Sequence, residues 1–402
     1  MKNYNELIAE NLAWAEETFK KIDKKMSKLT LRSRYKIPDG VDENGVHIDL
    51  QEKDPNGWTN GFWGGLNCLL YEHTGNEDYL ETAKTSEKIM DKALANFPLL
   101  NHDVGFIWHL LSGALHTLTG DPQSRMRNLF AASSFSSRFV LGGEYFRAWN
   151  HSGRKTMNWT IIDTMMNLPI LFWASRELDD DRFSRLAIAH ADTTLREHIR
   201  PDGSVVHVVE HNRDTGETVK TFFGQGIAVG SSWSRGQAWA LYGFAIAYIN
   251  THEKRYLDAA KSVAHYFIAN CCDDWLPRID FRAPSEPVYY DSTAGACAAC
   301  GLIEIAKNVP EHEAGMYLNA AINILRAMEE KFIDWSDDTD CMLNYASRRY
   351  PAGSITEEKA GVHISIIYGD YFYIEAILKL LGSDFNPWFV KPAEHEENAQ
   401  KK

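Results

Sequence analysis

The stretch Ser231-Ser-Trp-Ser-Arg-Gly-Gln-Ala-Trp-Ala-Leu-Tyr242 places two tryptophans and an arginine within seven residues. It predicts the start of a helix, because Ser231 or Ser232 can accept hydrogen bonds from the free N–H groups of a first turn. Arg235 and Trp239 are four residues apart and would share one face of that helix. A guanidinium beside an indole suits a flat, anionic, sugar-like ligand. The structural alternative is a core helix whose arginine stem packs on apolar neighbours.

Helices of this kind recur along the chain. Six segments rich in small and aromatic residues begin near Trp58, Asp103, Ile162, Ser232, Asp291 and Tyr368. Five of them are followed by a more charged, amphipathic segment, and the N-terminal segment Asn5–Lys25 can supply the sixth partner. A helix that is apolar all round belongs inside a protein, and a helix with a charged face belongs outside. Repetition of such a two-helix unit predicts a solenoid or a closed toroid.

Closure of the ring by the N-terminal helix favours an all-α (α/α)6 barrel, with an open superhelix as the alternative. We expect this barrel to form one domain over residues 1–390, followed by a polar, disordered tail over residues 391–402. The one stretch with strand character runs from Gly203 to Phe223 and predicts a β-hairpin inserted at the barrel mouth. His207 lies in this hairpin, where a structural role and a functional role are both open.

The composition excludes several classes of partner. The 402 residues carry a formal net charge of −13, which argues against nucleic acid and anionic membrane surfaces. No apolar run approaches the length of a membrane span. The charged N-terminal segment lacks the apolar stretch of a signal peptide, so we expect a cytoplasmic protein. Monomer and homodimer are both open.

The cysteines predict no metal or redox chemistry. We expect reduced, buried, inert thiols at all six positions, Cys68, Cys271, Cys272, Cys297, Cys300 and Cys341. Cys297 and Cys300 have the spacing of a metal or redox pair, but no second pair accompanies them. No set of histidines and carboxylates has ligand spacing on one helix either. No metal and no other cofactor is therefore expected.

The segments that enter the six inner helices carry an unusual share of reactive and aromatic side chains. In a closed ring these segments meet at one mouth, where they would gather Trp58, Trp63, His102, Asp103, Trp159, Asp163, Trp233, Arg235, Asp291 and Asp370. Each aspartate could simply cap its helix or interact with the helix dipole. Because tryptophans and an arginine occupy matching positions, the set as a whole favours a shared active site.

Two carboxylates at such a mouth suit acid–base chemistry on a sugar. Asp163 follows the apolar run Trp159-Thr-Ile-Ile, a setting expected to raise its pKa and keep a proton available near neutrality. Asp103 is adjacent to His102. We expect these two aspartates to be the catalytic residues.

Six segments of the chain resemble glycoside hydrolase family 88, the unsaturated glucuronyl hydrolases. They are Trp58-Thr-Asn-Gly-Phe-Trp63, His102-Asp-Val-Gly-Phe106, Ile161-Ile-Asp-Thr-Met-Met-Asn167, Ser231-Ser-Trp-Ser-Arg-Gly-Gln-Ala-Trp239, Asp291-Ser-Thr-Ala294 and Tyr368-Gly-Asp-Tyr-Phe-Tyr373. The resemblance implies an (α/α)6 barrel that removes a 4,5-unsaturated uronic acid from the non-reducing end of an oligosaccharide. The chemistry it implies is hydration: an aspartate protonates C4 of the enol ether and helps water to add at C5.

By position, the resemblance implies that Asp163 is the acid and base, and that Asp103 is its partner, which binds sugar hydroxyls and stays ionised. It places the substrate around Trp58, His102, His207, Gln225, Arg235 and Trp239, and we include Trp233 from the same stretch. Some family members that favour sulfated substrates carry a Ser-x-x-Ser-x-Lys run. Here the corresponding residues are Ser354-Ile-Thr-Glu-Glu-Lys359, so Ser354 and Lys359 are candidate contacts, while the two glutamates would repel a sulfate.

Four alternatives remain from the residues alone. The related unsaturated rhamnogalacturonyl hydrolases share the barrel. An inverting (α/α)6 glycosidase usually has a glutamate as proton donor, whereas the mouth positions here are aspartates. A sugar epimerase would need a histidine pair, and His207 has only His102 and His363 as potential partners. A non-catalytic oligosaccharide-binding toroid would bind sugar without turnover and would tolerate Asp163→Asn.

Overall fold

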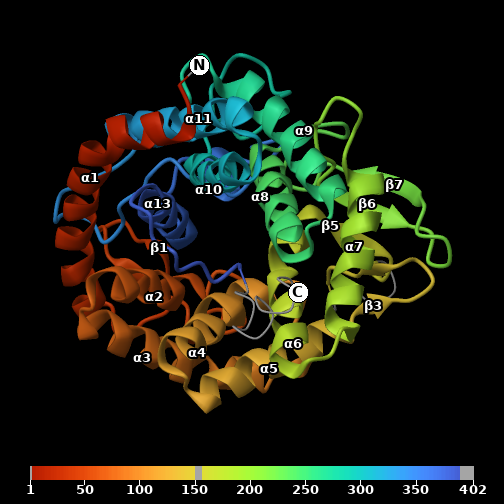
Figure 1. Ribbon diagram of the computed structural model, residues 1–402, viewed down its shortest axis with the longest axis horizontal. Helices are drawn as coiled ribbons and strands as arrows, with labels where there is room; N and C mark the ends of the chain where they lie inside the picture. The colour runs from red at the N-terminus through yellow and green to blue at the C-terminus, as the bar shows by residue number, and fades with distance from the viewer. Residues whose placement is uncertain (1, 150–155, 390–402) are drawn as a thin grey trace, which may run out of the picture.

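The computed structural model describes residues 2–149 and 156–389. The expected tail over 391–402 lies outside these residues, so the division of the chain into one domain and a tail stays a prediction. Within the described residues, helices form two concentric rings around a common centre (Figure 1).

The inner ring consists of six helical segments in the described part of the chain. They are α2 (Phe62–Thr74), the π-helix η2 with α4 (Gly105–Gly113 and Ala114–Thr119), the 3-10 helix η4 with α6 (Ile162–Asn167 and Pro169–Leu178), α8 (Ser234–Thr251), α10 (Ser292–Asn308) and α13 (Ile367–Leu380). Their side chains are buried almost all round; in α10, every residue from Ser292 to Ala306 is buried. The prediction that the helices rich in small and aromatic residues lie inside is confirmed.

The outer ring is made by the amphipathic helices. They are α1 (Tyr4–Arg32), α3 (Glu77–Leu94), α5 (Pro122–Ser136), α7 (Arg182–His198), α9 (Lys254–Cys271) and α11 (Glu311–Lys331). The first of these, α1, contacts α13, α11 and α3, and so joins the last helical pair to the first (Figure 1). The predicted (α/α)6 barrel is therefore confirmed, and the open superhelix was wrong.

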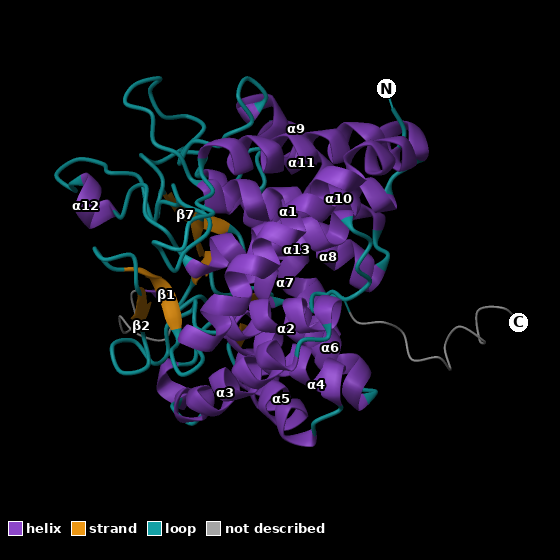
Figure 2. Cartoon of the chain, turned by 90° about the vertical axis from the view of Figure 1, so that its left-hand side faces the viewer, coloured by secondary structure: helices purple, strands orange, loops and turns teal. Residues whose placement is uncertain are grey.

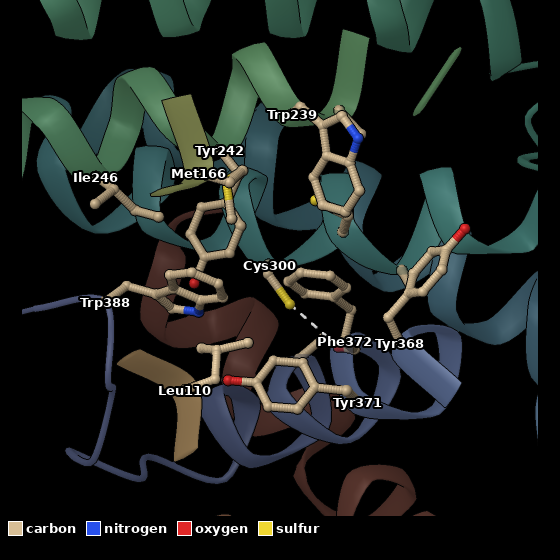
Figure 3. Close-up of a cluster of buried hydrophobic side chains, with 14 of the residues drawn as sticks. Leu110, Met166, Trp239, Tyr242, Ile246, Cys300, Tyr368, Tyr371, Phe372 and Trp388 are labelled. Carbon is tan, nitrogen blue, oxygen red and sulfur yellow. Dashed lines mark hydrogen bonds between the residues drawn. The ribbon is translucent and has the colours of Figure 1, made fainter. Parts of the chain in front are cut away.

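Small residues allow the inner helices to approach closely. A Cβ atom added to Gly301 of α10 would lie 2.9 Å from the Cα atom of Tyr242 in α8, so that position requires glycine. Large aromatic side chains fill the centre of the ring: Trp239 and Trp388 lie on either side of Phe372 (Figure 3), and the rings of Phe372 and Trp388 stack with an interplanar angle of 7°. Cys300 points into the same cluster, where its Sγ atom lies 3.1 Å from the carbonyl oxygen of Phe372.

The strands lie with most of the long loops at one end of the barrel (Figure 2). The described strands form three small antiparallel sheets, β1 (Pro38–Val41) with β2 (His47–Asp49), β3 (Phe139–Val140) with β4 (Tyr145–Phe146), and β5 (Trp159–Ile161) with β6 (Val208–His211) and β7 (Thr218–Phe222). The predicted hairpin is confirmed as β6–β7. The expectation that strand character is confined to it was wrong, because strands of two to four residues are too short to show an alternating pattern.

Two short helices complete the described secondary structure, the 3-10 helix η1 (Phe97–Leu99) and α12 (Glu357–Ala360) at the loop-rich end. The cysteines are free thiols, and all are buried except Cys272, which caps the C-terminus of α9 and is exposed against expectation. In residues 2–149 and 156–389, no group of three or more His, Cys, Asp or Glu side chains is arranged to hold a metal ion. No helix of this part is long and apolar enough to cross a bilayer.

Buried histidines predict a loss of stability in acid. Burial lowers the pKa of His47, His102 and His109 to about 4 and that of His198 to about 3. In the unfolded chain an imidazole has its ordinary pKa of about 6.5, so below that pH the unfolded state binds more protons than the folded state. Stability is therefore fully present above pH 6.5 and falls toward pH 4, by up to about 1.4 kcal/mol per imidazole and pH unit.

We expect the Tm measured by calorimetry to fall steeply between pH 6.5 and 4.5. The carboxyls of Asp103 and Asp370 act in the opposite direction, since burial raises the pKa of both, but the imidazoles outnumber them. His109→Gln is expected to make the decline shallower, whereas His312→Gln, at an exposed side chain, leaves it unchanged. A Tm that is constant over this range would contradict the prediction.

Candidate active site

His102 and Asp103 immediately precede the inner helix η2 and are both buried. The Nδ1 atom of His102 lies 2.9 Å from the carbonyl oxygen of Ala148, and since a carbonyl can only accept, Nδ1 carries a proton. In the neutral imidazole Nε2 is then unprotonated, and it lies 3.2 Å from Oδ1 of Asp103. Two lone pairs repel each other at this distance, so the contact is favourable when Asp103 is protonated.

A buried arginine fixes the position of that carbonyl group. Arg138 is only 4% exposed, and its Nη2 atom donates to the carbonyl oxygens of Ala148 and Arg147 at 2.8 and 3.0 Å. The backbone N–H of His102 donates to the same Ala148 oxygen at 3.3 Å. The orientation of the His102 ring therefore depends on Arg138, which the sequence analysis missed because no local motif marks it.

Asp163 and His207 are brought together by the three-stranded sheet. Ile161 pairs with Val208, and the N–H of Ile162 donates to the carbonyl of His207. Asp163, which follows Ile162, therefore lies beside His207. The backbone N–H of Gln225 donates to Nδ1 of His207 at 3.1 Å, which leaves the proton of the neutral ring on Nε2. That Nε2 atom lies 3.5 Å from Oδ2 of Asp163.

The two facing atoms, His207 Nε2 and Asp163 Oδ2, are buried and have no hydrogen-bond partner among the described residues. The His207 ring is held by stacking on Trp233, with ring centroids 4.2 Å apart. Buried polar atoms without partners are rare in folded proteins. A sugar hydroxyl bound between them could satisfy both atoms.

The two carboxyl groups have opposite pKa shifts. Burial, followed by the charge of Asp163, raises the pKa of Asp103 well above its ordinary value. Burial would also raise the pKa of Asp163, but His207, His102 and Arg235 outweigh it and hold that pKa below the ordinary value. The expectation of a raised pKa at Asp163 was therefore wrong, because partners distant in sequence outweigh the effect of burial.

Arg235 is committed to the protein rather than open to a ligand. It is 1% exposed, and its Nη1 atom lies 2.5 Å from Oδ2 of Asp291. The same atom donates to the carbonyl of Ser347 at 2.6 Å, and Nη2 donates to the carbonyl of Arg348 at 2.9 Å. Its guanidinium also packs on the Trp233 ring, 4.5 Å from the centroid. Arg235 therefore anchors the loop that begins at Ser347.

The start of helix α8 differs from the prediction. Its N-cap residue is Trp233, with no side-chain hydrogen bond to the helix, so neither serine caps it. Ser232 instead donates through its hydroxyl to Gln237 and through its backbone N–H to Asp280. Asp280 also accepts from the N–H of Ile227, and so holds the loop that carries Gln225. No sequence signal pointed to Asp280.

The remaining predicted site residues differ in exposure. Trp58 is half-buried, with its ring centroid 4.8 Å from that of Tyr368, and can present an aromatic face. Trp239 is fully buried in the central aromatic cluster (Figure 3). Ser354 and Lys359 are exposed around α12, and no side-chain contact joins either residue to the others within the described residues.

Two aspartates expected at the mouth have structural partners. Asp291 accepts from Arg235 and from the Thr293 hydroxyl. Asp370 accepts from the backbone N–H groups of Met342 and Leu343 at 3.1 and 2.7 Å. Neither carboxyl caps its own helix through the side chain. They stabilise the loops around the site.

A double ring of helices that gathers two interacting carboxyls and an open aromatic face at one end is the architecture of a carbohydrate-active barrel enzyme, a glycoside hydrolase. The chain belongs to glycosyl hydrolase family 88, whose family model matches residues 36–330.

Several known proteins are similar to this chain. The unsaturated glucuronyl hydrolase of Bacillus sp. (strain GL1) is 32% identical over 84% of this chain and 90% of that protein. The unsaturated chondroitin disaccharide hydrolase of Streptococcus pyogenes serotype M1 is 32% identical over 83% of each chain. Among solved structures, the unsaturated glucuronyl hydrolase from Streptococcus agalactiae superposes with a TM-score of 0.85 at 26% identity, over 93% of this chain and 94% of the other.

Proposed function

We propose that this protein removes 4,5-unsaturated glucuronic acid from the non-reducing end of glycosaminoglycan oligosaccharides produced by polysaccharide lyases. The observation that carries the proposal is the pair of buried Asp103 and partly buried Asp163, whose pKa values are shifted in opposite directions. Such a pair supplies one proton donor and one anion at the same pH. The substrates named for the relatives from Bacillus and Streptococcus pyogenes support the substrate class.

Substrate binding moves the proton between the two carboxyls in this proposal. Before the substrate binds, the raised pKa of Asp103 favours its protonated form, which faces the unprotonated Nε2 of His102. Sugar hydroxyls that donate to Asp103 stabilise its ionised form, and the carboxylate of the substrate raises the pKa of Asp163 through like-charge repulsion. The proton then lies on Asp163, and Asp103 is the anion.

The reaction follows from that state. Asp163 gives its proton to C4 of the enol ether, and positive charge develops at C5 and the ring oxygen. The ionised Asp103 stabilises this charge electrostatically. Water adds at C5 and loses a proton to Asp163, which restores the acid. The hemiketal formed at C5 opens without further help, and the glycosidic bond is lost.

Other residues surround the sugar in this proposal. His207 and Gln225 donate to the sugar at the Asp163 side, His102 orients Asp103, and Trp58 supplies an aromatic face, while the buried Trp233 stacks on His207. Arg235 and Trp239 support the site from within the protein, since both are buried by other side chains. Ser354 and Lys359 stay candidate contacts of the leaving sugar, next to Glu357 and Glu358, whose charges disfavour a sulfate.

Ultraviolet absorbance tests the proposal, because the conjugated C=C–COO⁻ group of the substrate absorbs and its hydrated product does not. We expect the purified protein to abolish the band of unsaturated chondroitin and hyaluronan disaccharides. Activity confined to unsaturated rhamnogalacturonan products would make the protein a pectin-type hydrolase instead. Tight binding without any loss of absorbance would make it a binding toroid.

We also propose a cytoplasmic location, with the protein acting as a monomer or homodimer. The free thiols support a reducing compartment, since exported proteins commonly pair their cysteines. Cell fractionation and sedimentation check the two statements, and recovery in an exported fraction would overturn the first.

A further inference from the structure

The proposed substrate carries a carboxylate, and a buried anion needs a cationic or N–H partner. Arg235 is one candidate partner, but its guanidinium is already bound by Asp291, Thr293 and two backbone carbonyls. A second arginine lies beside it. The residue whose carbonyl accepts from Arg235 Nη2 is Arg348, and its own side chain is 47% exposed.

The backbone carbonyl of Arg348 contacts two predicted site residues. Its carbonyl oxygen accepts from Gln225 Nε2 at 2.6 Å as well as from Arg235 Nη2. Gln225 in turn orients His207 toward Asp163. Gln225 and His207, which contact each other, therefore connect Arg348 to Asp163.

The side chain of Arg348 is held in one direction. Its stem packs over Gly361, where an added Cβ would lie 3.1 Å from Cγ and Cδ of Arg348, at a backbone φ of 61°. Its Nη2 atom pairs with Oδ2 of Asp39 on β1. Asp39 also accepts from the hydroxyl of Thr59, the neighbour of Trp58, at 3.0 Å. The ion pair thus joins the Arg348 loop to the segment that carries Trp58.

The guanidinium also lies close to the aromatic face of the mouth. Burial raises the pKa of Tyr368 to about 12, and the positive charge of Arg348 is among the influences that lower it. The Tyr368 ring contacts that of Trp58. A guanidinium has five N–H donors. In the described residues Asp39 accepts from one nitrogen of Arg348, so the half-exposed remainder can bind an anion in a bidentate manner.

We propose that Arg348 is a specificity-determining residue that binds an acidic group of the substrate, in competition with Asp39 for its guanidinium. The proposal rests on the proposed function. The acidic group is either the carboxylate of the unsaturated uronate or a sulfate on the leaving sugar, and the two sources differ in which substrates depend on Arg348.

Calorimetric binding tests this in a background of Asp163→Asn, in which turnover does not obscure affinity. We expect adding Arg348→Met to raise the Kd about 10- to 100-fold, the loss of a charge-assisted pair. If the carboxylate is the partner, the Kd rises equally for non-sulfated and sulfated unsaturated chondroitin disaccharides. If a sulfate is the partner, the Kd rises only for the sulfated disaccharide. Arg349→Met, at the exposed neighbouring arginine, is the matched control and is expected to leave the Kd unchanged.

Asp39→Asn distinguishes ligand binding by Arg348 from a purely structural role of the ion pair. It breaks the same ion pair but leaves the guanidinium free, so we expect tighter binding of the acidic disaccharide. If the ion pair only holds the two segments together, Asp39→Asn and Arg348→Met should weaken binding equally. That result, or an unchanged Kd in Arg348→Met, would overturn the proposal. Thermal unfolding of each variant confirms that it is folded. The proposed function is judged separately, by turnover of the wild-type protein.

Discussion

Asp163→Asn is expected to lower kcat on unsaturated disaccharides by about 10³-fold or more. General acid–base catalysis contributes about 10²- to 10⁴-fold in enzymes, and in the proposed mechanism one carboxyl both donates the proton to C4 and accepts one from water. Asparagine keeps the size of the side chain but can do neither. His207 Nε2, 3.5 Å from the carboxyl oxygen, faces an amide oxygen or nitrogen instead, so substrate binding should persist.

The measurement is the decay of the ultraviolet band under saturating substrate, together with the Kd from calorimetry. Asp181→Asn is the matched control, because Asp181 pairs with Arg185 on the protein surface, with a side chain that is 68% exposed. It should leave kcat unchanged. If Asp163→Asn retained a tenth of the wild-type rate, Asp163 would not be the proton donor, and Asp103, whose pKa is raised by burial, would be the next residue to test.

Repetition in the sequence was sufficient to predict the barrel. Helices that are apolar all round alternate with amphipathic helices because burial selects the residues at every turn, and so the sequence shows a clear pattern of hydrophobicity. The same reasoning located Trp58, Asp103 and Asp163, since the segments that enter the inner helices meet at one end of a closed ring. The short strand β5 left no such pattern, although it positions Asp163 opposite His207.

The electrostatics of the site could not be predicted in this way. The raised pKa of Asp103 comes from burial and from the charge of Asp163, which is distant in sequence. The guanidinium of Arg235 is paired with Asp291, which is 56 residues away in sequence and 2.5 Å from it. Such pairings are set by tertiary packing, so neighbouring residues carry no trace of them. They decide which groups remain available to a ligand.

The pairing of Arg235 with Asp291 leads to a second large expected effect. Asp291→Ala should lower the free energy of unfolding by about 3–5 kcal/mol, the usual cost of leaving one partner of a buried ion pair without the other. Both side chains are at most 2% exposed, so water cannot replace the lost carboxylate. Urea unfolding at unchanged m-value measures the difference. Asp181→Ala at the surface pair is the control, with an expected effect below about 1 kcal/mol.

The cause of that loss can be separated from simple removal of side-chain volume. In the double variant Arg235→Met/Asp291→Leu no charge is left unpaired, and apolar side chains fill the space, so most of the stability should return. Its activity should not return, because the guanidinium also holds the carbonyls of Ser347 and Arg348 that position the mouth loop. A double variant as unstable as Asp291→Ala would show that packing, rather than the unpaired charge, sets the cost. An Asp291→Ala protein within 1 kcal/mol of wild type would contradict the ion pair itself.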